Sequence, residues 1–177
     1  MTAPDWQARL VAPRFVPYAG ADIAYARGAP PEHLISRLHL IGVTPDGSVL
    51  VCRSIEGWRF LPGGTREPGE SVRELAGREL LEEAGAVFRT EPVVFAAHAA
   101  TSRLPQPYRP HQPHPYAYWA YAVGQVVVSG PPTNPPDGEQ IVAVSELDPA
   151  AAVTELESHD VLHADVLRDA IGRGLVR

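Results

Sequence analysis

The sequence of 177 residues lacks lysine altogether and contains a single cysteine. Because all 15 basic residues are arginines, a Schiff-base mechanism and a phosphate-binding loop that ends in lysine are both excluded. The lone Cys52 excludes an internal disulfide and a cysteine zinc cluster, and we expect it to be a small core residue in a reducing compartment. A basic excess is also missing: the net charge of −6 argues against a general nucleic-acid-binding protein.

Signals for export and for membrane insertion are absent from the sequence as well. The first ten residues, MTAPDWQARL, lack the basic and apolar regions of a secretory signal. With 45% hydrophobic and 20% charged residues, the composition is that of a globular protein, and no stretch predicts a transmembrane helix. We therefore expect a cytoplasmic protein without membrane contacts. The sequence leaves open whether it forms a homodimer.

The length predicts one domain, which we place at residues 35–177, with residues 1–34 as an N-terminal arm packed on it. Runs of β-branched and other apolar residues between turn signals predict strands at 35–44, 48–55, 58–61, 87–89, 93–100, 117–128 and 141–145. Helical periodicity predicts a helix after residue 71, a helical turn near 148 and a closing helix over 159–173. This order indicates an α/β protein with a mixed sheet between helices.

The helix after Ser71 has clear signals at both ends. The Ser71 hydroxyl and the Glu74 carboxylate have the spacing of a capping box, in which each side chain accepts a backbone hydrogen bond from the other residue. Gly85 is the residue expected just past the last turn, where a left-handed conformation ends the helix. The sequence therefore predicts a helix that runs from residue 72 to about 84.

Three carboxylates continue the apolar stripe of this helix. Glu79, Glu82 and Glu83 lie three and four positions apart, so each like-charged pair costs roughly 0.2–0.5 kcal/mol. They also lie at the negative end of the helix dipole. A bound hard cation such as Mg²⁺, which prefers carboxylate oxygens, would remove both penalties. The alternative is a solvated acidic helix end, as is usual for surface charges.

The helix belongs to a longer pattern of glycines and charged residues. It consists of Gly64, five residues, Glu70, seven residues, Arg78-Glu79-Leu80, one residue, Glu82-Glu83, one residue and Gly85. At each of these positions the pattern resembles the box of the Nudix hydrolase family. Only the position after Gly85 differs, where Ala86 replaces the usual bulky apolar residue. The preceding run WRFLPGG is also similar to the segment that leads into the box in many of these enzymes.

The resemblance implies an α/β/α sandwich and a defined chemistry. Nudix hydrolases use Mg²⁺, which Mn²⁺ can replace, to hydrolyse a nucleoside diphosphate linked to another moiety, by attack of water on phosphorus. By position, Glu79, Glu82 and Glu83 would be metal ligands or water-activating groups, with the Gly63 carbonyl as a further ligand. The absence of a Cβ atom at Gly63 and Gly64 permits a close approach of the backbone. A small nucleotide-type substrate is therefore the expected partner.

Other acidic and basic residues have two interpretations each. Arg78 would orient the box carboxylates in the family, although its spacing also predicts an ordinary helix ion pair with Glu74 or Glu82. Glu70 would brace the loop and the metal shell, or simply favour the helix N-terminus. Some Nudix enzymes recruit a carboxylate from a late loop, for which Glu139 is the first candidate and Asp137 the second; the alternative is an exposed turn acid.

The proline-rich stretch 103–116 is long for a loop without secondary structure, which indicates a functional or a disordered segment. We predict that Tyr108, Arg109, His111 and His114 contact the non-phosphate part of the substrate or its phosphates, and we add Arg59, from the strand before the box. Zinc binding by the two histidines would need further ligands that the sequence does not identify. Solvated loop histidines are the simpler interpretation.

Two other function classes deserve comparison with a hydrolase. A Nudix-like sensor would bind a nucleotide or nucleotide sugar without turnover, but such proteins generally have degraded boxes, whereas this box is intact. Isopentenyl-diphosphate isomerases share the fold and use a catalytic cysteine, and Cys52 in LVCRS does not resemble that motif. The sequence therefore favours a Mg²⁺-dependent pyrophosphohydrolase.

Overall fold

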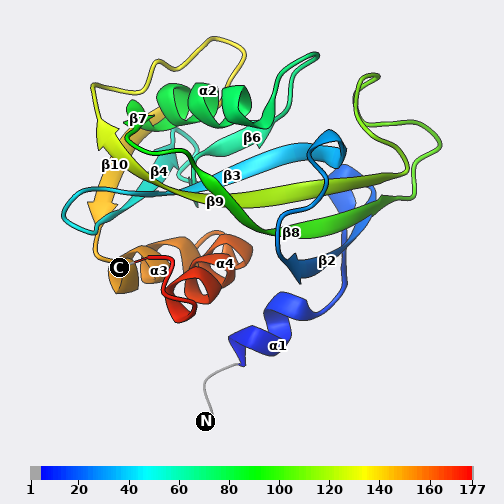
Figure 1. Cartoon of the computed structure of the whole chain (residues 1–177), viewed down its shortest axis with the longest axis horizontal. Coiled ribbons are helices and arrows are strands. Elements are labelled where there is room, and N and C mark those ends of the chain that lie inside the picture. The colour runs from blue at the N-terminus through cyan, green and yellow to red at the C-terminus, as the bar shows by residue number, and fades with distance from the viewer. Residues whose placement is uncertain (1–4, 177) are drawn as a thin grey trace.

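The computed structural model describes residues 5–176, which form one mixed sheet with helices on both faces (Figure 1). The strands are β1 (Arg14–Val16), β2 (Ala21–Arg27), β3 (Ile35–Val43), β4 (Val49–Ser54), β5 (Arg59–Phe60), β6 (Gly63–Thr65), β7 (Ala86–Phe88), β8 (Val93–Ser102), β9 (Tyr116–Val128) and β10 (Ile141–Leu147). The helices are α1 (Trp6–Val11), α2 (Val72–Ala84), α3 (Pro149–Glu157) and α4 (Val161–Gly172), with short 3-10 turns η1 (Pro17–Ala19) and η2 (Glu32–Leu34). The α/β class and the sandwich of sheet and helices are confirmed.

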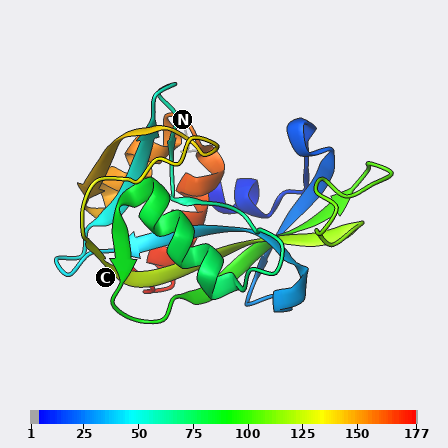
Figure 2. The same ribbon diagram turned by 90° about the horizontal axis from the view of Figure 1, so that it is seen from above.

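The strand order of the main path is β1-β2-β8-β9-β3-β4-β10. Only β3 and β9 run parallel, and the other neighbours are antiparallel, so the sheet is mixed as predicted. Helix α2 lies across one face, while α3 and α4 cover the other (Figures 1 and 2). None of the helices within residues 5–176 is long and apolar enough to cross a membrane.

The predicted hairpin of β3 and β4 opens immediately beyond its turn. The two strands pair only at Val43 and Val49, because β6 then takes the place beside β3 and β5 the place beside β4. Gly63 and Gly64 in β6 are thereby set against His39 and Leu38 of β3. The loop that leads into α2 is held at the middle of the sheet by this split.

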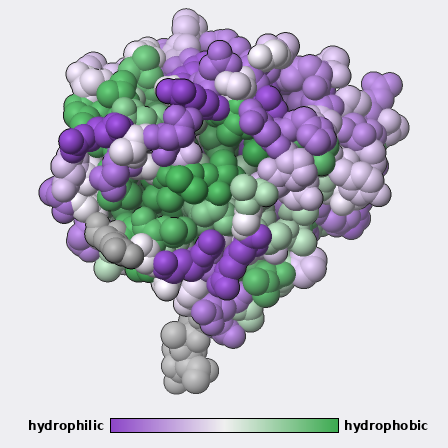
Figure 3. All heavy atoms as spheres, in the orientation of Figure 1, coloured by the Kyte–Doolittle hydropathy of each residue, from purple (hydrophilic) through white to green (hydrophobic). Residues whose placement is uncertain are grey.

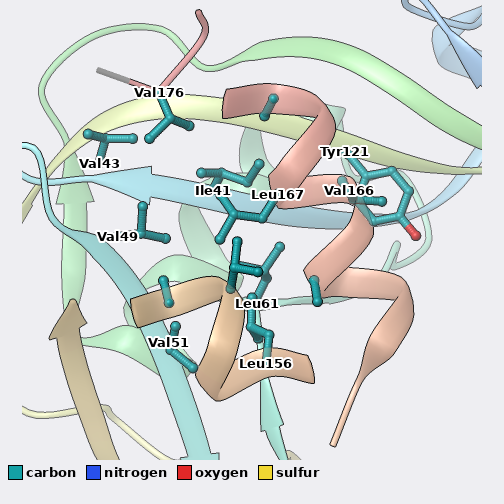
Figure 4. Packing of buried hydrophobic residues seen from close by; sticks show 14 of the residues in the cluster. Ile41, Val43, Val49, Val51, Leu61, Tyr121, Leu156, Val166, Leu167 and Val176 are labelled. Carbon is teal, nitrogen blue, oxygen red and sulfur yellow. The ribbon is translucent and has the colours of Figure 1, made fainter. Parts of the chain in front are cut away.

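Two hydrophobic clusters fill the two interlayer spaces, and β3 contributes to both. Leu38 and Leu40 face α2, whereas Ile41 and Val43 pack against α3 and α4, as the period of two along a strand requires. Figure 4 shows the second cluster, in which Ile41 and Leu61 from the sheet side meet Leu156 of α3 and Leu167 of α4. Ala86 is fully buried in the first cluster.

The segment predicted as an N-terminal arm adds strands to the sheet. Strand β2 pairs with β8 along its whole length, from Ala21 opposite Ser102 to Arg27 opposite Ala96, and β1 pairs with β2 at the sheet edge. Three of the seven residues of β2 are alanines, so local propensity does not predict a strand, and pairing with β8 supplies the missing stabilisation. Residues 1–4 of the arm lie outside the described part of the chain.

A buried carboxylate fastens β2 to α4. Asp169 accepts hydrogen bonds from the Tyr25 hydroxyl at 2.8 Å, from Arg27 Nη2 at 2.6 Å and from Arg173 Nη1 at 3.2 Å. Its side chain is 1% exposed. Burial opposes its ionisation, but the bonds from Arg27, Tyr25 and Arg173 outweigh that effect, so the pKa of Asp169 lies below its ordinary value.

We predict that Asp169→Asn lowers the free energy of unfolding by about 1–3 kcal/mol, because charge-assisted hydrogen bonds of a buried acceptor are lost. The matched control is Asp22→Asn, which breaks a bidentate pair with Arg103 whose side chains are 44% and 61% exposed. That variant should lose clearly less, because both side chains are largely solvated. Equal losses for the two variants in denaturant unfolding would contradict the role assigned to Asp169.

Candidate active site

Helix α2 begins and ends as its sequence predicts. The Ser71 hydroxyl accepts the Glu74 amide at 3.2 Å, and a Glu74 carboxylate oxygen accepts the Ser71 amide at 2.8 Å, which completes the capping box. Gly85 is left-handed, with φ of 59°, and ends the helix. Leu75, Ala76 and Leu80 pack against the sheet and set the rotation of the helix, and with it the direction in which its carboxylates point.

The glycines before the helix are required by close contacts. A Cβ atom on Gly63 would lie 2.2 Å from the Leu38 carbonyl oxygen, and one on Gly64 would lie 2.2 Å from Glu79 Oε1. Both distances are far below any tolerated contact, so no larger residue fits at either position without a shift of the backbone. The backbone of β6 therefore passes directly over the acidic face of α2.

Arg78 connects the box loop to the helix. Its guanidinium donates from Nε and Nη2 to the two carboxylate oxygens of Glu70, at 2.7 and 3.1 Å. The Nη1 group donates to Glu79 at 2.9 Å and to Glu82 at 3.2 Å. Since Glu74 is engaged in the capping box, the alternative Glu74–Arg78 ladder is replaced by this network. The arrangement agrees with an orienting role for Arg78 and a bracing role for Glu70.

Two of the three helix carboxylates are buried. Glu79 and Glu83 are each 7% exposed, whereas the side chain of Glu82 is 25% exposed. Burial raises the pKa of Glu79 to about 7, against the effect of Arg78 and with the repulsion of Glu82. Burial raises the pKa of Glu83 to about 8, although the Gly63 amide donates to its Oε2 at 2.8 Å. The Arg78 guanidinium and the Gly63 amide therefore do not fully compensate the negative charge that Glu79 and Glu83 carry when they are ionised.

A cleft of about 400 Å³ lies over these side chains. Besides the helix carboxylates, its wall is formed by Gly63, Gly64, Thr65, Glu67, Arg78, Arg109, Pro135, Asp137, Gly138 and Glu139. Glu139 and Asp137 reach it from the loop before β10, and Glu139 is close enough to add to the raised pKa of Glu83. The structure thus brings both late-loop candidates together with Gly63, Gly64, Arg78 and the three helix carboxylates. Glu70 does not line the cleft and is connected to it through Arg78.

Among the predicted substrate contacts, only Arg109 lines this cleft. The Tyr108 ring lies 5.5 Å from the Arg37 guanidinium carbon, the His111 Nε2 donates to the Arg66 carbonyl at 2.8 Å, and the His114 Nε2 donates to the Leu104 carbonyl at 2.9 Å. The first two contacts hold the loop 103–116 against the rest of the molecule, whereas the third lies within the loop. On the face shown in Figure 3, the atoms on the side of this loop are mainly hydrophilic.

Arg59 lies elsewhere, beside a second pocket of about 630 Å³. It donates to Glu155 at 2.8 Å and lies 2.8 Å from His159 Nε2. The same pocket is lined from three distant segments by four residues that were not predicted from the sequence, Tyr18, His39, Asp160 and His163. The spacing of Asp160 and His163 at a predicted helix start was the one available signal.

The donors of the acidic cleft suit a hard cation, because they are carboxylate and carbonyl oxygens. Within residues 5–176, no three His, Cys, Asp or Glu side chains already converge as a set of metal ligands. In this structure the Nη1 group of Arg78 engages one oxygen each of Glu79 and Glu82.

The mixed sheet, the capped helix and the acidic cleft agree with the fold and site expected of the Nudix family, whose box the sequence resembles. A model of the NUDIX domain matches residues 37–170. The chain therefore belongs to the family of Nudix pyrophosphohydrolases. A search of curated proteins found no match.

Solved structures support the fold. A mutant of the Bacillus subtilis pyrophosphohydrolase BsRppH superposes with a TM-score of 0.61 at 13% identity, covering 89% of this chain and 94% of that one. A MutT protein from Methanosarcina mazei Go1 gives 0.54 at 18% identity, with coverage of 82% and 99%. A NUDIX hydrolase from Nitrosomonas europaea gives 0.53 at 21% identity, with coverage of 78% and 90%.

The raised pKa values predict an unusual pH dependence of stability in metal-free buffer. The ordinary pKa of glutamate is 4.5, whereas the folded values are about 7 for Glu79 and about 8 for Glu83. Between the ordinary pKa of 4.5 and these raised pKa values, the folded protein binds more protons than the unfolded chain. The free energy of unfolding therefore falls as the pH rises, by up to about 1.4 kcal/mol per pH unit for each proton.

We expect Glu83→Gln and Glu79→Gln to remove part of this slope and to be neutral or stabilising at pH 8 without metal. The measurement is thermal unfolding in a chelator from pH 5 to 8, expressed as the difference from wild type. The exposed Glu91→Gln variant should keep the wild-type slope. A lower melting temperature of Glu79→Gln at pH 8 without metal would show that Glu79 instead holds a structural ion pair.

Proposed function

We propose that the protein is a Mg²⁺-dependent pyrophosphohydrolase that cleaves a nucleoside diphosphate linked to another moiety. The observation that carries this proposal is the pair of buried, incompletely neutralised carboxylates Glu79 and Glu83 under an acidic cleft. A folded protein accepts such a costly arrangement when a ligand offsets it, and an oxygen-only donor set favours a hard divalent cation.

In this proposal Glu79, Glu82 and Glu83 hold the metal, together with the Gly63 carbonyl. When bound, Mg²⁺ neutralises pyrophosphate oxygens that otherwise repel a nucleophile, and lowers the pKa of an attacking water. Arg78 keeps two of the carboxylates in position, while Glu70 and the Thr65 carbonyl accept its remaining hydrogen bonds. Glu139, on the rim of the cleft, is available as the base that receives the proton of the water.

Arg109 is the group suited to bind the substrate phosphate. It lines the cleft from the loop 103–116, and its side chain forms no hydrogen bond or ion pair with any described residue. Arg78, the other arginine of the cleft wall, is committed to three carboxylates. A guanidinium without an internal partner can take two phosphate oxygens at once.

The first activity prediction concerns the carboxylates. Hydrolysis should require Mg²⁺ or Mn²⁺, and Glu82→Gln or Glu83→Gln should lower kcat about 100-fold or more, the scale of lost electrostatic or acid–base catalysis. The assay is phosphate release from nucleoside triphosphates, dinucleoside polyphosphates, nucleotide sugars and ADP-ribose after phosphatase coupling. The exposed Glu91→Gln variant is the control.

Full activity in a chelator, or in both glutamine variants, would contradict the proposal. Saturable binding of a nucleotide by the wild-type protein without product release would instead identify a Nudix-like sensor.

The second activity prediction concerns Arg109. Arg109→Ala should raise KM about tenfold, because a charge-assisted contact to phosphate is lost, and should leave the Mg²⁺ requirement intact. Arg89→Ala, which removes an exposed arginine outside the cleft, should not change KM. Replacing residues 105–114 with a Gly/Ser linker should have at least the effect of Arg109→Ala. An unchanged kcat/KM for every substrate in both loop variants would leave the loop without a role in binding.

A further inference from the structure

The acidic cleft continues into the second pocket, because both are lined by Gly63, Glu83 and Glu139. The second pocket is the larger, at about 630 Å³ against about 400 Å³. The two pockets therefore adjoin each other, the first with the helix carboxylates on its wall and the second with a different set of side chains. If the phosphates of a substrate lie in the acidic cleft, the rest of the substrate has to lie in a neighbouring space. The second pocket is such a space, because it shares Glu83, a proposed metal ligand, with the cleft.

Aromatic side chains form the rim of the second pocket. Tyr18 comes from η1 and is 72% exposed, and Trp58, just before β5, is 58% exposed. Phe60 lies half-buried on the same wall. Large exposed aromatic faces around a cavity are costly to leave in water and offer surfaces on which a flat ring can stack.

The inner wall carries polar groups without internal partners. His163, 5% exposed, accepts the Leu61 amide at its Nδ1 at 3.2 Å, which requires that nitrogen to be unprotonated. Burial lowers the pKa of His163, so the imidazole is neutral and its proton is on Nε2. No described residue accepts a hydrogen bond from that Nε2.

Asp160 provides the complementary acceptor. One of its oxygens caps α4 by accepting the His163 amide at 3.0 Å, while Oδ2 lies 3.3 Å from the unprotonated Nδ1 of His163 and receives no hydrogen bond from it. The Nδ1 of His39, on the same lining, is buried and also has no partner among residues 5–176. An acceptor on Asp160 and a donor on His163 are therefore both available in the lining of this pocket.

We propose that the second pocket binds the nucleobase of the substrate, with Asp160 and His163 as the residues that determine base specificity. The Asp160 Oδ2 accepts a ring N–H or amino group, and the His163 Nε2–H donates to an adjacent ring oxygen or nitrogen. Trp58 and Tyr18 stack on the ring or cover its edge. The assignment rests on the proposed function for the position of the phosphates, but binding in this pocket needs neither metal nor turnover.

The test is isothermal titration of metal-free protein with AMP, GMP, UMP and CMP, and with ribose 5-phosphate as a ligand that lacks the base. We expect at least one nucleotide to bind about tenfold or more tightly than ribose 5-phosphate. Trp58→Ala should weaken that nucleotide about tenfold, and Asp160→Asn, which keeps a helix-capping side chain but replaces an acceptor by a donor, should change the order of preference among the four bases.

Asp148→Asn is the matched control, because Asp148 caps α3 in the same way and lies outside the pocket. It should leave all affinities unchanged, and melting temperatures should verify that each variant is folded. Equal binding of ribose 5-phosphate and all nucleotides, or an unaltered affinity in Trp58→Ala together with an unaltered preference in Asp160→Asn, would overturn the proposal. Because no hydrolysis is measured, a failure here is distinct from a failure of the phosphate-release assay.

Discussion

The bidentate pair between Arg78 and Glu70 is the contact on which the candidate site depends. It joins the loop after β6 to the middle of α2, while the same guanidinium reaches Glu79 and Glu82 on its other side. A planar fork can make these bonds at once, whereas a lysine ammonium cannot serve two carboxylate planes in this way. The chain, which has arginine at every basic position, uses that geometry to order an otherwise repulsive acidic surface.

The candidate site destabilises the fold electrostatically, and this free-energy cost falls mainly on Glu79 and Glu83. Glu79 and Glu83 are buried because they continue the stripe of α2 that faces the sheet, and the close passage of β6 removes water from them. Arg78 donates a hydrogen bond to Glu79 but not to Glu83. Among the described residues, only the Gly63 backbone amide donates to the Glu83 carboxylate. The helix therefore combines a well-capped start with a destabilised end, and the site lies at that end.

Local signals in the sequence were sufficient for most of the framework. The capping box, the terminal glycine and the strand runs depend on neighbours within a few residues, and each was predicted near its observed bounds. Two segments, the one before residue 35 and residues 63–65, were not predicted as strands. β2 is a strand through its pairing with β8, more than 60 residues away along the chain, and β6 is a strand through its pairing with β3. Likewise, the loop contacts of His111 and His114 are with backbone carbonyls that no spacing rule identifies.

By itself, the sequence determined the family, the α/β class and the acidic face of the box helix, because these follow from the order of residues within short segments. Only the tertiary structure decided which groups share a cavity. Arg109, Glu139 and the helix carboxylates meet in one cleft, and Tyr18, Trp58, Asp160 and His163 meet in another, although they are scattered over the chain. The physical reason is that sheet pairing and layer packing, rather than local propensity, bring distant segments to the same edge.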